Sequence, residues 1–77
     1  MRIQVFAALK DFFDNEFEAD GSIKTLVELR RSLILSKPEA ENILNNCRFA
    51  VDEEFVDMNY KLKANDTIAI IPPSSGG

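Results

Sequence analysis

Alternation of apolar and polar residues predicts a strand at the start of the chain. Over residues 2–9 the hydrophobic positions recur with a period of two, which is typical of a strand with one buried face. We expect Ile3, Val5 and Ala7 to face the core. Phe6 then points away from the core, because successive side chains leave a strand on opposite faces.

Further strands are indicated by short apolar or alternating runs between polar turns. They are residues 16–19, 48–51, 55–56 and 67–71. The last run is continuous and rich in isoleucine, which favours a central strand. A polar turn precedes it, and we expect a left-handed backbone at Asn65 because asparagine tolerates that conformation better than most residues.

A helix is predicted to begin at Thr25. Leu26, Leu29 and Leu33 follow at spacings of three and four residues and form one apolar stripe. Thr25 and Glu28 have the spacing of a capping box, in which each side chain satisfies a free backbone N–H of the other. We therefore expect this helix to pack its leucines on the sheet.

A second, shorter helix is predicted to run to about residue 46. Ser36 and Glu39 have the spacing of another capping box, and Pro38 lies in the first turn, where a missing N–H costs little. Its expected buried residues are Ala40, Ile43, Leu44 and Cys47.

This order of elements is typical of an α+β, β-grasp (ubiquitin-like) domain over residues 1–71. We expect a mixed sheet of about five strands with one long helix and one short helix, and the last strand parallel to the first. Pro72 and Pro73 end the last strand because neither can donate to a ladder. Residues 72–77 are then expected to form a flexible tail, because the four residues after the prolines have no apolar side chain.

Composition and charge restrict the chemistry. The 77 residues contain no histidine and one cysteine, so an internal disulfide is impossible and a bound metal is not expected. The net charge of −4 argues against nucleic acid and against an anionic membrane as partners. No stretch approaches the roughly 20 apolar residues of a membrane span. A cytoplasmic location is expected, because a lone unpaired cysteine fits a reducing compartment.

The other candidate groups have plain interpretations. Without a histidine to activate it, Cys47 is expected to be a small buried residue and not a nucleophile. The carboxylates of residues 11–20 and 52–57 could form acid–base pairs or metal ligands, but solvated acidic faces are the favoured interpretation. The chain has no glycine-rich phosphate loop, so any ATP must be bound by another protein.

The chain ends in Gly76 and Gly77, which suggests a function for the terminus. Glycine has no Cβ, so its backbone can thread a narrow channel. A terminal carboxylate joined to AMP by a partner enzyme becomes a good electrophile, and a sulfur nucleophile could replace AMP to leave a thiocarboxylate. The alternative is that the two glycines are an artificial addition or the end of a truncated linker.

An outward-facing apolar set is predicted beside the tail. If the first and last strands lie side by side, Phe6 comes near Ile71, and Phe55 could join them. An exposed apolar patch of this kind suggests a docking surface. The alternative is that these side chains complete a second, smaller core or are only partly exposed.

Several segments resemble the small subunit of molybdopterin synthase (MoaD type). They are residues 6–9, 25–29, 50–56 and 62–77, and the Ile-Pro-Pro-x-Ser-Gly-Gly ending is the most specific of them. The resemblance covers nearly the whole chain. Two positions depart from the family pattern: Asp52 stands where the family usually has Asn, and Asn65 where it usually has Gly.

The resemblance implies a sulfur carrier that is not catalytic alone and binds no cofactor. A ubiquitin-activating-like adenylyltransferase would use ATP to adenylate Gly77, and a sulfur donor would convert it to the thiocarboxylate. The tail would insert into the large subunit of molybdopterin synthase, in a heterotetramer, and give sulfur to cyclic pyranopterin monophosphate (precursor Z) to form the dithiolene of molybdopterin. The implied partner-binding residues are Phe6, Phe55, Ile71, Pro72, Pro73, Ser74 and Ser75, with Gly76 next to the reacting Gly77.

Three alternatives remain open from the sequence. A thiamine-pathway sulfur carrier also ends in Gly-Gly, although such carriers usually lack the Pro-Pro pair. A ubiquitin-like protein modifier begins with the same adenylation but is joined to lysines of target proteins. A plain β-grasp interaction module would leave the terminus unused.

Overall fold

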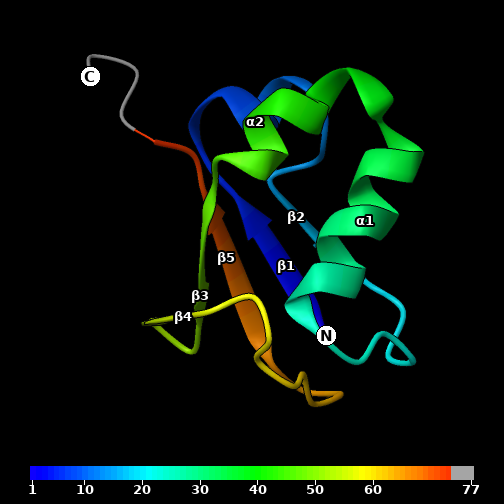
Figure 1. Ribbon diagram of the computed structural model, residues 1–77, viewed down its shortest axis with the longest axis vertical. Helices are drawn as coiled ribbons and strands as arrows, with labels where there is room; N and C mark the ends of the chain where they lie inside the picture. The colour runs from blue at the N-terminus through cyan, green and yellow to red at the C-terminus, as the bar shows by residue number, and fades with distance from the viewer. Residues whose placement is uncertain (74–77) are drawn as a thin grey trace.

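Five strands form one mixed sheet, and the helices cover one of its faces (Figure 1). The computed structural model describes residues 1–73. Its elements are β1 (Arg2–Val5), η1 (Ala7–Asp11), β2 (Glu16–Glu18), α1 (Leu26–Ser36), η2 (Pro38–Ala40), α2 (Glu41–Asn45), β3 (Arg48–Val51), β4 (Glu54–Val56) and β5 (Thr67–Ile71). The strand order is β2-β1-β5-β3-β4, with β5 in the centre and parallel to β1. The predicted β-grasp arrangement is therefore confirmed.

The core lies between the sheet and α1. Along β5 the burial alternates, so that Ile68 and Ile70 are fully buried while their neighbours are only partly covered. Ile68 is paired with Ile3, and Ile70 with Val5, across the parallel ladder. These four positions therefore give the sheet its apolar inner face, as the alternation of the sequence predicted for Ile3 and Val5.

The helix α1 begins where the sequence placed it. The Thr25 hydroxyl oxygen accepts a hydrogen bond from the Glu28 N–H at 3.2 Å. The Glu28 carboxylate accepts from the Lys24 N–H at 3.0 Å, one residue earlier than in a standard capping box. Leu26, Leu29 and Leu33 are buried, and each packs into the core.

The predicted first strand is too long. β1 ends at Val5, and residues 7–11 form the 3₁₀ helix η1. Ala7 has a positive φ of 54°, which turns the chain out of the ladder and leaves its side chain exposed instead of facing the core. Leu9, within this 3₁₀ helix, is completely buried and adds a large apolar side chain to the core.

The predicted second capping box is also wrong. Lys37, and not Ser36, precedes the first turn, and no side chain caps it. Pro38 occupies the start of this turn as expected, since its ring fixes a helical φ. The helix itself is divided into η2 and α2, which together bury Ala40 and Leu44.

The left-handed backbone lies in another turn than predicted. Asn65 is not among the residues with positive φ, whereas Asp52 (50°) and Glu53 (75°) are. These two residues join β3 to β4, and a two-residue hairpin with both φ values positive matches the right-handed twist of its strands. The turn before β5 is held instead by Asp66, whose buried carboxylate accepts from the Lys63 N–H at 2.7 Å.

Candidate functional site

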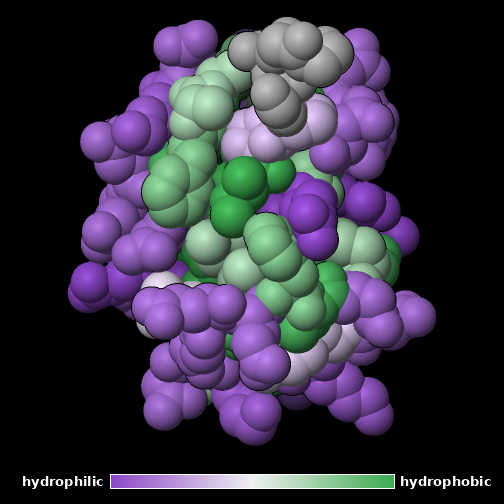
Figure 2. All heavy atoms as spheres, turned by 90° about the vertical axis from the view of Figure 1, so that its left-hand side faces the viewer, coloured by the Kyte–Doolittle hydropathy of each residue, from purple (hydrophilic) through white to green (hydrophobic). Residues whose placement is uncertain are grey.

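An exposed apolar patch lies on the face of the sheet that no helix covers. We call it the outer-face patch and define it by Phe6, Phe55, Ile71 and Arg48. Phe6 is 40% exposed and Phe55 is 52% exposed, while Ile71 is half-buried. Figure 2 shows this side of the molecule, where apolar side chains gather in the middle and hydrophilic ones surround them. The predicted outward-facing set is therefore present.

The register of the sheet brings the patch together. The parallel ladder has Val5 beside Ile70, so the next residues, Phe6 in extended backbone just beyond β1 and Ile71 at the end of β5, lie on the opposite face. Ile71 is in turn paired with Arg48 of β3. Residues from three segments far apart in sequence thus meet at one end of the sheet.

Arg48 and Phe55 are in direct contact. The guanidinium carbon of Arg48 lies 3.9 Å from the centroid of the Phe55 ring, which is the geometry of a cation–π interaction. Phe55 is on β4 opposite Ala50, and Ala50 shares the outer face with Arg48 two residues before it. Arg48 was not predicted from the sequence as a site residue, although the period of two in β3 places it on this face.

The C-terminal strand leads from the patch into the tail. Pro72 is half-buried and Pro73 is exposed directly after Ile71. The predicted residues Ser74, Ser75, Gly76 and Gly77 lie outside the described part of the chain. The predicted tail of residues 72–77 is therefore described only at its two prolines, which follow on from Ile71 of the patch.

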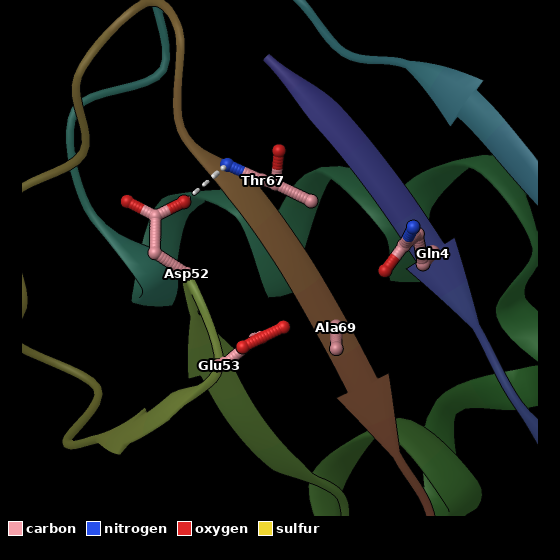
Figure 3. A pocket seen from close by; sticks show the side chains of 5 residues that line it. All are labelled: Gln4, Asp52, Glu53, Thr67 and Ala69. Carbon is pink, nitrogen blue, oxygen red and sulfur yellow. Dashed lines mark hydrogen bonds between the residues drawn. The ribbon is translucent and has the colours of Figure 1, made fainter.

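A shallow hollow lies on the same face of the sheet, toward the end of β5 opposite Ile71, and two of its lining residues are acidic (Figure 3). It has a volume of about 480 Å³ and is lined by Gln4, Asp52, Glu53, Thr67 and Ala69. The Asp52 N–H donates to the Thr67 carbonyl at 3.0 Å, and the Asp52 carboxylate accepts from the Thr67 N–H at 3.4 Å. These two hydrogen bonds hold the β3–β4 turn against β5. The carboxylates of Asp52 and Glu53 therefore form an acidic border at this end of the outer face.

Among residues 1–73, no three metal-binding side chains are grouped closely enough to hold an ion. In the same part of the chain, no helix has the length and apolar character needed to cross a membrane. The third exposed large hydrophobic residue, Leu35, belongs to α1 and is not part of the outer-face patch.

Cys47 lies between α2 and β3 and is not an activated thiol. Its sulfur donates to the Ile43 carbonyl at 3.1 Å, and the residue is half-buried against the core. Burial raises the pKa of the Cys47 thiol from 9.0 to about 11. The thiolate is the nucleophilic form, so this cysteine is poorly suited to carry sulfur at neutral pH.

The thiol of the folded protein should therefore be slow to alkylate. At pH 8 we expect iodoacetamide to modify Cys47 about 100-fold more slowly than an ordinary thiol, because the thiolate fraction falls tenfold for each unit by which the pKa rises. The rate should increase with pH towards a midpoint near 11. Protein unfolded in urea serves as the control. Equal alkylation rates for the folded and unfolded chains would contradict a raised pKa of the Cys47 thiol in the folded protein.

The sheet order, the crossing helix and the exposed outer face define a protein of the β-grasp, ubiquitin-like class. Within this class, the chain belongs to the ThiS family, whose model matches residues 3–77. The resemblance found in the sequence is thus confirmed, since two curated relatives are named molybdopterin synthase sulfur carrier subunits.

The relative from Dictyostelium discoideum is 32% identical over 99% of this chain and 94% of its own length. The relative from Chlamydomonas reinhardtii is 38% identical over 65% of this chain, and the match spans 63% of that protein's length.

Two solved structures have the same fold. One is a complex of subunits 1 and 2 of the molybdopterin-converting factor from Helicobacter pylori, in which the similar chain has a TM-score of 0.67 and 27% identity, over 99% of this chain and 96% of that one. The other is SAMP1 from Haloferax volcanii, with a TM-score of 0.74 and 21% identity over 99% of this chain and 97% of that one. At 21% identity the second match supports the fold alone.

Proposed function

We propose that this chain is the sulfur-carrier subunit of a molybdopterin synthase and that its working group is the carboxylate of Gly77. The observation that carries the proposal is geometric: the central strand β5 ends inside an exposed apolar patch, at the point where the C-terminal segment leaves the sheet. A docking surface so placed would deliver the terminus to a partner's active site. The names of the two curated relatives agree with this function.

The chemistry requires two steps before transfer. A carboxylate oxygen of Gly77 attacks the α-phosphorus of ATP on an adenylyltransferase, and pyrophosphate leaves. Hydrosulfide (HS⁻) supplied by the sulfur donor then attacks the acyl carbon, AMP leaves with the bonding electron pair, and loss of the S–H proton leaves the thiocarboxylate on Gly77. The carrier contributes a terminal acyl group, and the partner enzyme contributes the nucleotide site.

The acceptor in this proposal is cyclic pyranopterin monophosphate, held by the large subunit. Each dithiolene contains two sulfur atoms, so two carrier molecules are consumed for each product. The solved complex of subunits 1 and 2 of the molybdopterin-converting factor supports a large-subunit partner for this chain. On this account the chain is not an enzyme alone, since the acid–base groups belong to the large subunit.

The outer-face patch is the proposed docking surface. Interface centres are apolar and enriched in aromatic residues and arginine, and this patch combines Phe6, Phe55 and Ile71 with Arg48. Pro72 and Pro73 would give the segment beyond the patch an extended backbone, because proline fixes φ near the polyproline value. Ser74 and Ser75 would then follow the prolines into the partner, ahead of Gly76 and Gly77.

The test is an intact-mass spectrum after incubation with ATP, the cognate adenylyltransferase and a sulfur source. A gain of about 16 Da, the mass by which sulfur exceeds oxygen, is expected on conversion of the carboxylate to the thiocarboxylate. Adding the large subunit and precursor should then return the original mass. No gain, with enzymes shown to be active on another carrier, would contradict the proposal.

Two further outcomes would redirect the assignment. A thiocarboxylate that discharges to a thiamine-pathway acceptor and not to the pyranopterin would identify the other sulfur carrier. Isopeptide-linked conjugates in a lysate would identify a protein modifier. The names of the curated relatives favour the molybdopterin pathway over both.

A further inference from the structure

A single cation stands in the middle of the outer-face patch. Arg48 is exposed, is paired through its backbone with Ile71, and holds its guanidinium 3.9 Å from the Phe55 ring centroid. The ion pairs in residues 1–73 involve only Arg2 and the N-terminal amine, so Arg48 has no anionic partner there. In an acidic chain, this position is therefore distinguished by its charge as well as by its apolar neighbours.

The contact with Phe55 leaves the donors of Arg48 available. A guanidinium that stacks on an aromatic ring uses its flat face and keeps its N–H groups directed outwards from its edge. Its fork of donors matches a carboxylate, which can accept two parallel hydrogen bonds. The ring also limits the movement of the arginine, so less side-chain freedom remains to be lost when a ligand binds.

Docking would remove this cation from water. Burying an unpaired charge in an apolar interface is strongly unfavourable, whereas a hydrogen-bonded counter-ion offsets the loss of hydration. A partner that covers Phe6, Phe55 and Ile71 with apolar side chains alone would leave Arg48 unsatisfied. The partner must therefore place an anion among its apolar contacts.

Resting on the function proposed above, we propose that Arg48 determines the specificity of docking by pairing with a carboxylate side chain of the large subunit. The acidic residues Asp52 and Glu53 increase this specificity, because they repel a partner whose carboxylate lies opposite the hairpin turn and not opposite Arg48. The fitting partner surface has an apolar centre, one Asp or Glu opposite Arg48, and neutral or basic groups opposite the hairpin turn.

The test compares Arg48→Met with Arg31→Met in titration calorimetry against the cognate large subunit. Methionine keeps much of the apolar stem and removes the charge. Arg31 is also exposed but belongs to α1, on the opposite side of the sheet from the patch, so its replacement makes the same change in net charge. We expect Arg48→Met to weaken binding about 10-fold to 100-fold and to reduce its salt dependence, and Arg31→Met to change it less than about twofold.

Further variants separate charge from packing. Arg48→Lys should recover part of the affinity because it restores the charge without the fork, and Arg48→Glu should bind more weakly than Arg48→Met because it opposes the partner's carboxylate. Melting curves of each variant show whether the fold is retained. Equal affinities for wild type and Arg48→Met, or equal losses for Arg48→Met and Arg31→Met, would overturn the inference alone. A wild-type chain that does not bind the large subunit would overturn the proposed function as well.

Discussion

Removal of Gly77, or addition of one residue after it, is expected to abolish sulfur transfer while leaving the stability of the domain unchanged. In the proposed function the reacting carbon belongs to the terminal residue, so truncation would move it back by one residue and extension would move it forward by one, about 3.5 Å in each case. Near-attack geometry tolerates much less than this: a misplacement of about 1 Å can reduce a rate about 100-fold. Every buried core residue of the described chain lies between Met1 and Ile70, so neither change removes a core contact.

The measurement is the mass gain on activation, followed by single-turnover conversion of the pyranopterin with the large subunit. Thermal unfolding reports the stability in parallel. Gly76→Ala is a useful comparison, because it keeps the length and the terminal carboxylate and tests only the need for a backbone without Cβ in the partner's channel. Full transfer by the truncated chain would show that the terminus is not the carrier group.

The sequence predicted β5 and the start of α1 well, because the residue pattern that identifies each of them lies within the element itself. Burial alternates along β5 because successive side chains point to opposite faces of the sheet and only one face packs in the core with α1. The start of α1 was predictable because Thr25 and Glu28 satisfy backbone groups within one turn. Local rules are sufficient at the start of α1, since no distant residue is needed to complete the cap.

The errors arose where tertiary contacts override a local pattern. Residues 6–9 continue the alternation of β1, yet the chain turns at Ala7 and buries Leu9 from a 3₁₀ helix, which the alternation does not indicate. At the β3–β4 turn, Asp52 and Glu53 adopt left-handed backbones because the hairpin is closed by both strands. The register that closes it depends on residues far away in the sequence.

The candidate site shows the same division. Phe6, Phe55 and Ile71 could be selected from the sequence because large apolar residues on the outer side of a strand are conspicuous. Arg48 could not be selected in this way, because an exposed arginine is ordinary until the sheet places it over Phe55 and beside Ile71. The chemistry of the face therefore depends on strand order as well as on composition.

Ile70→Ala should destabilise the domain far more than Ile71→Ala, although the two residues are adjacent and the chemical change is identical. Ile70 is fully buried, so its truncation removes core contacts and leaves a cavity, with an expected loss of about 2–5 kcal/mol in the free energy of unfolding. Domains of this size have only about 4–12 kcal/mol in total, so the loss is a large part of it. Ile71 is half-buried on the outer face, so we expect its truncation to cost less than about 1 kcal/mol.

Binding to the large subunit should follow the reverse order. Ile71→Ala removes an apolar contact from the centre of the proposed interface and is expected to weaken binding about tenfold. Ile70→Ala, measured at a temperature where it is still folded, should bind nearly as tightly as wild type because its side chain faces the core. Urea titration and calorimetry on the same samples give both quantities. Equal losses of stability for the two variants would mean that Ile70 and Ile71 do not lie on different faces of β5, one in the core and one in the docking surface. A loss of binding confined to Ile71→Ala would show that the partner contacts the outer face of this strand.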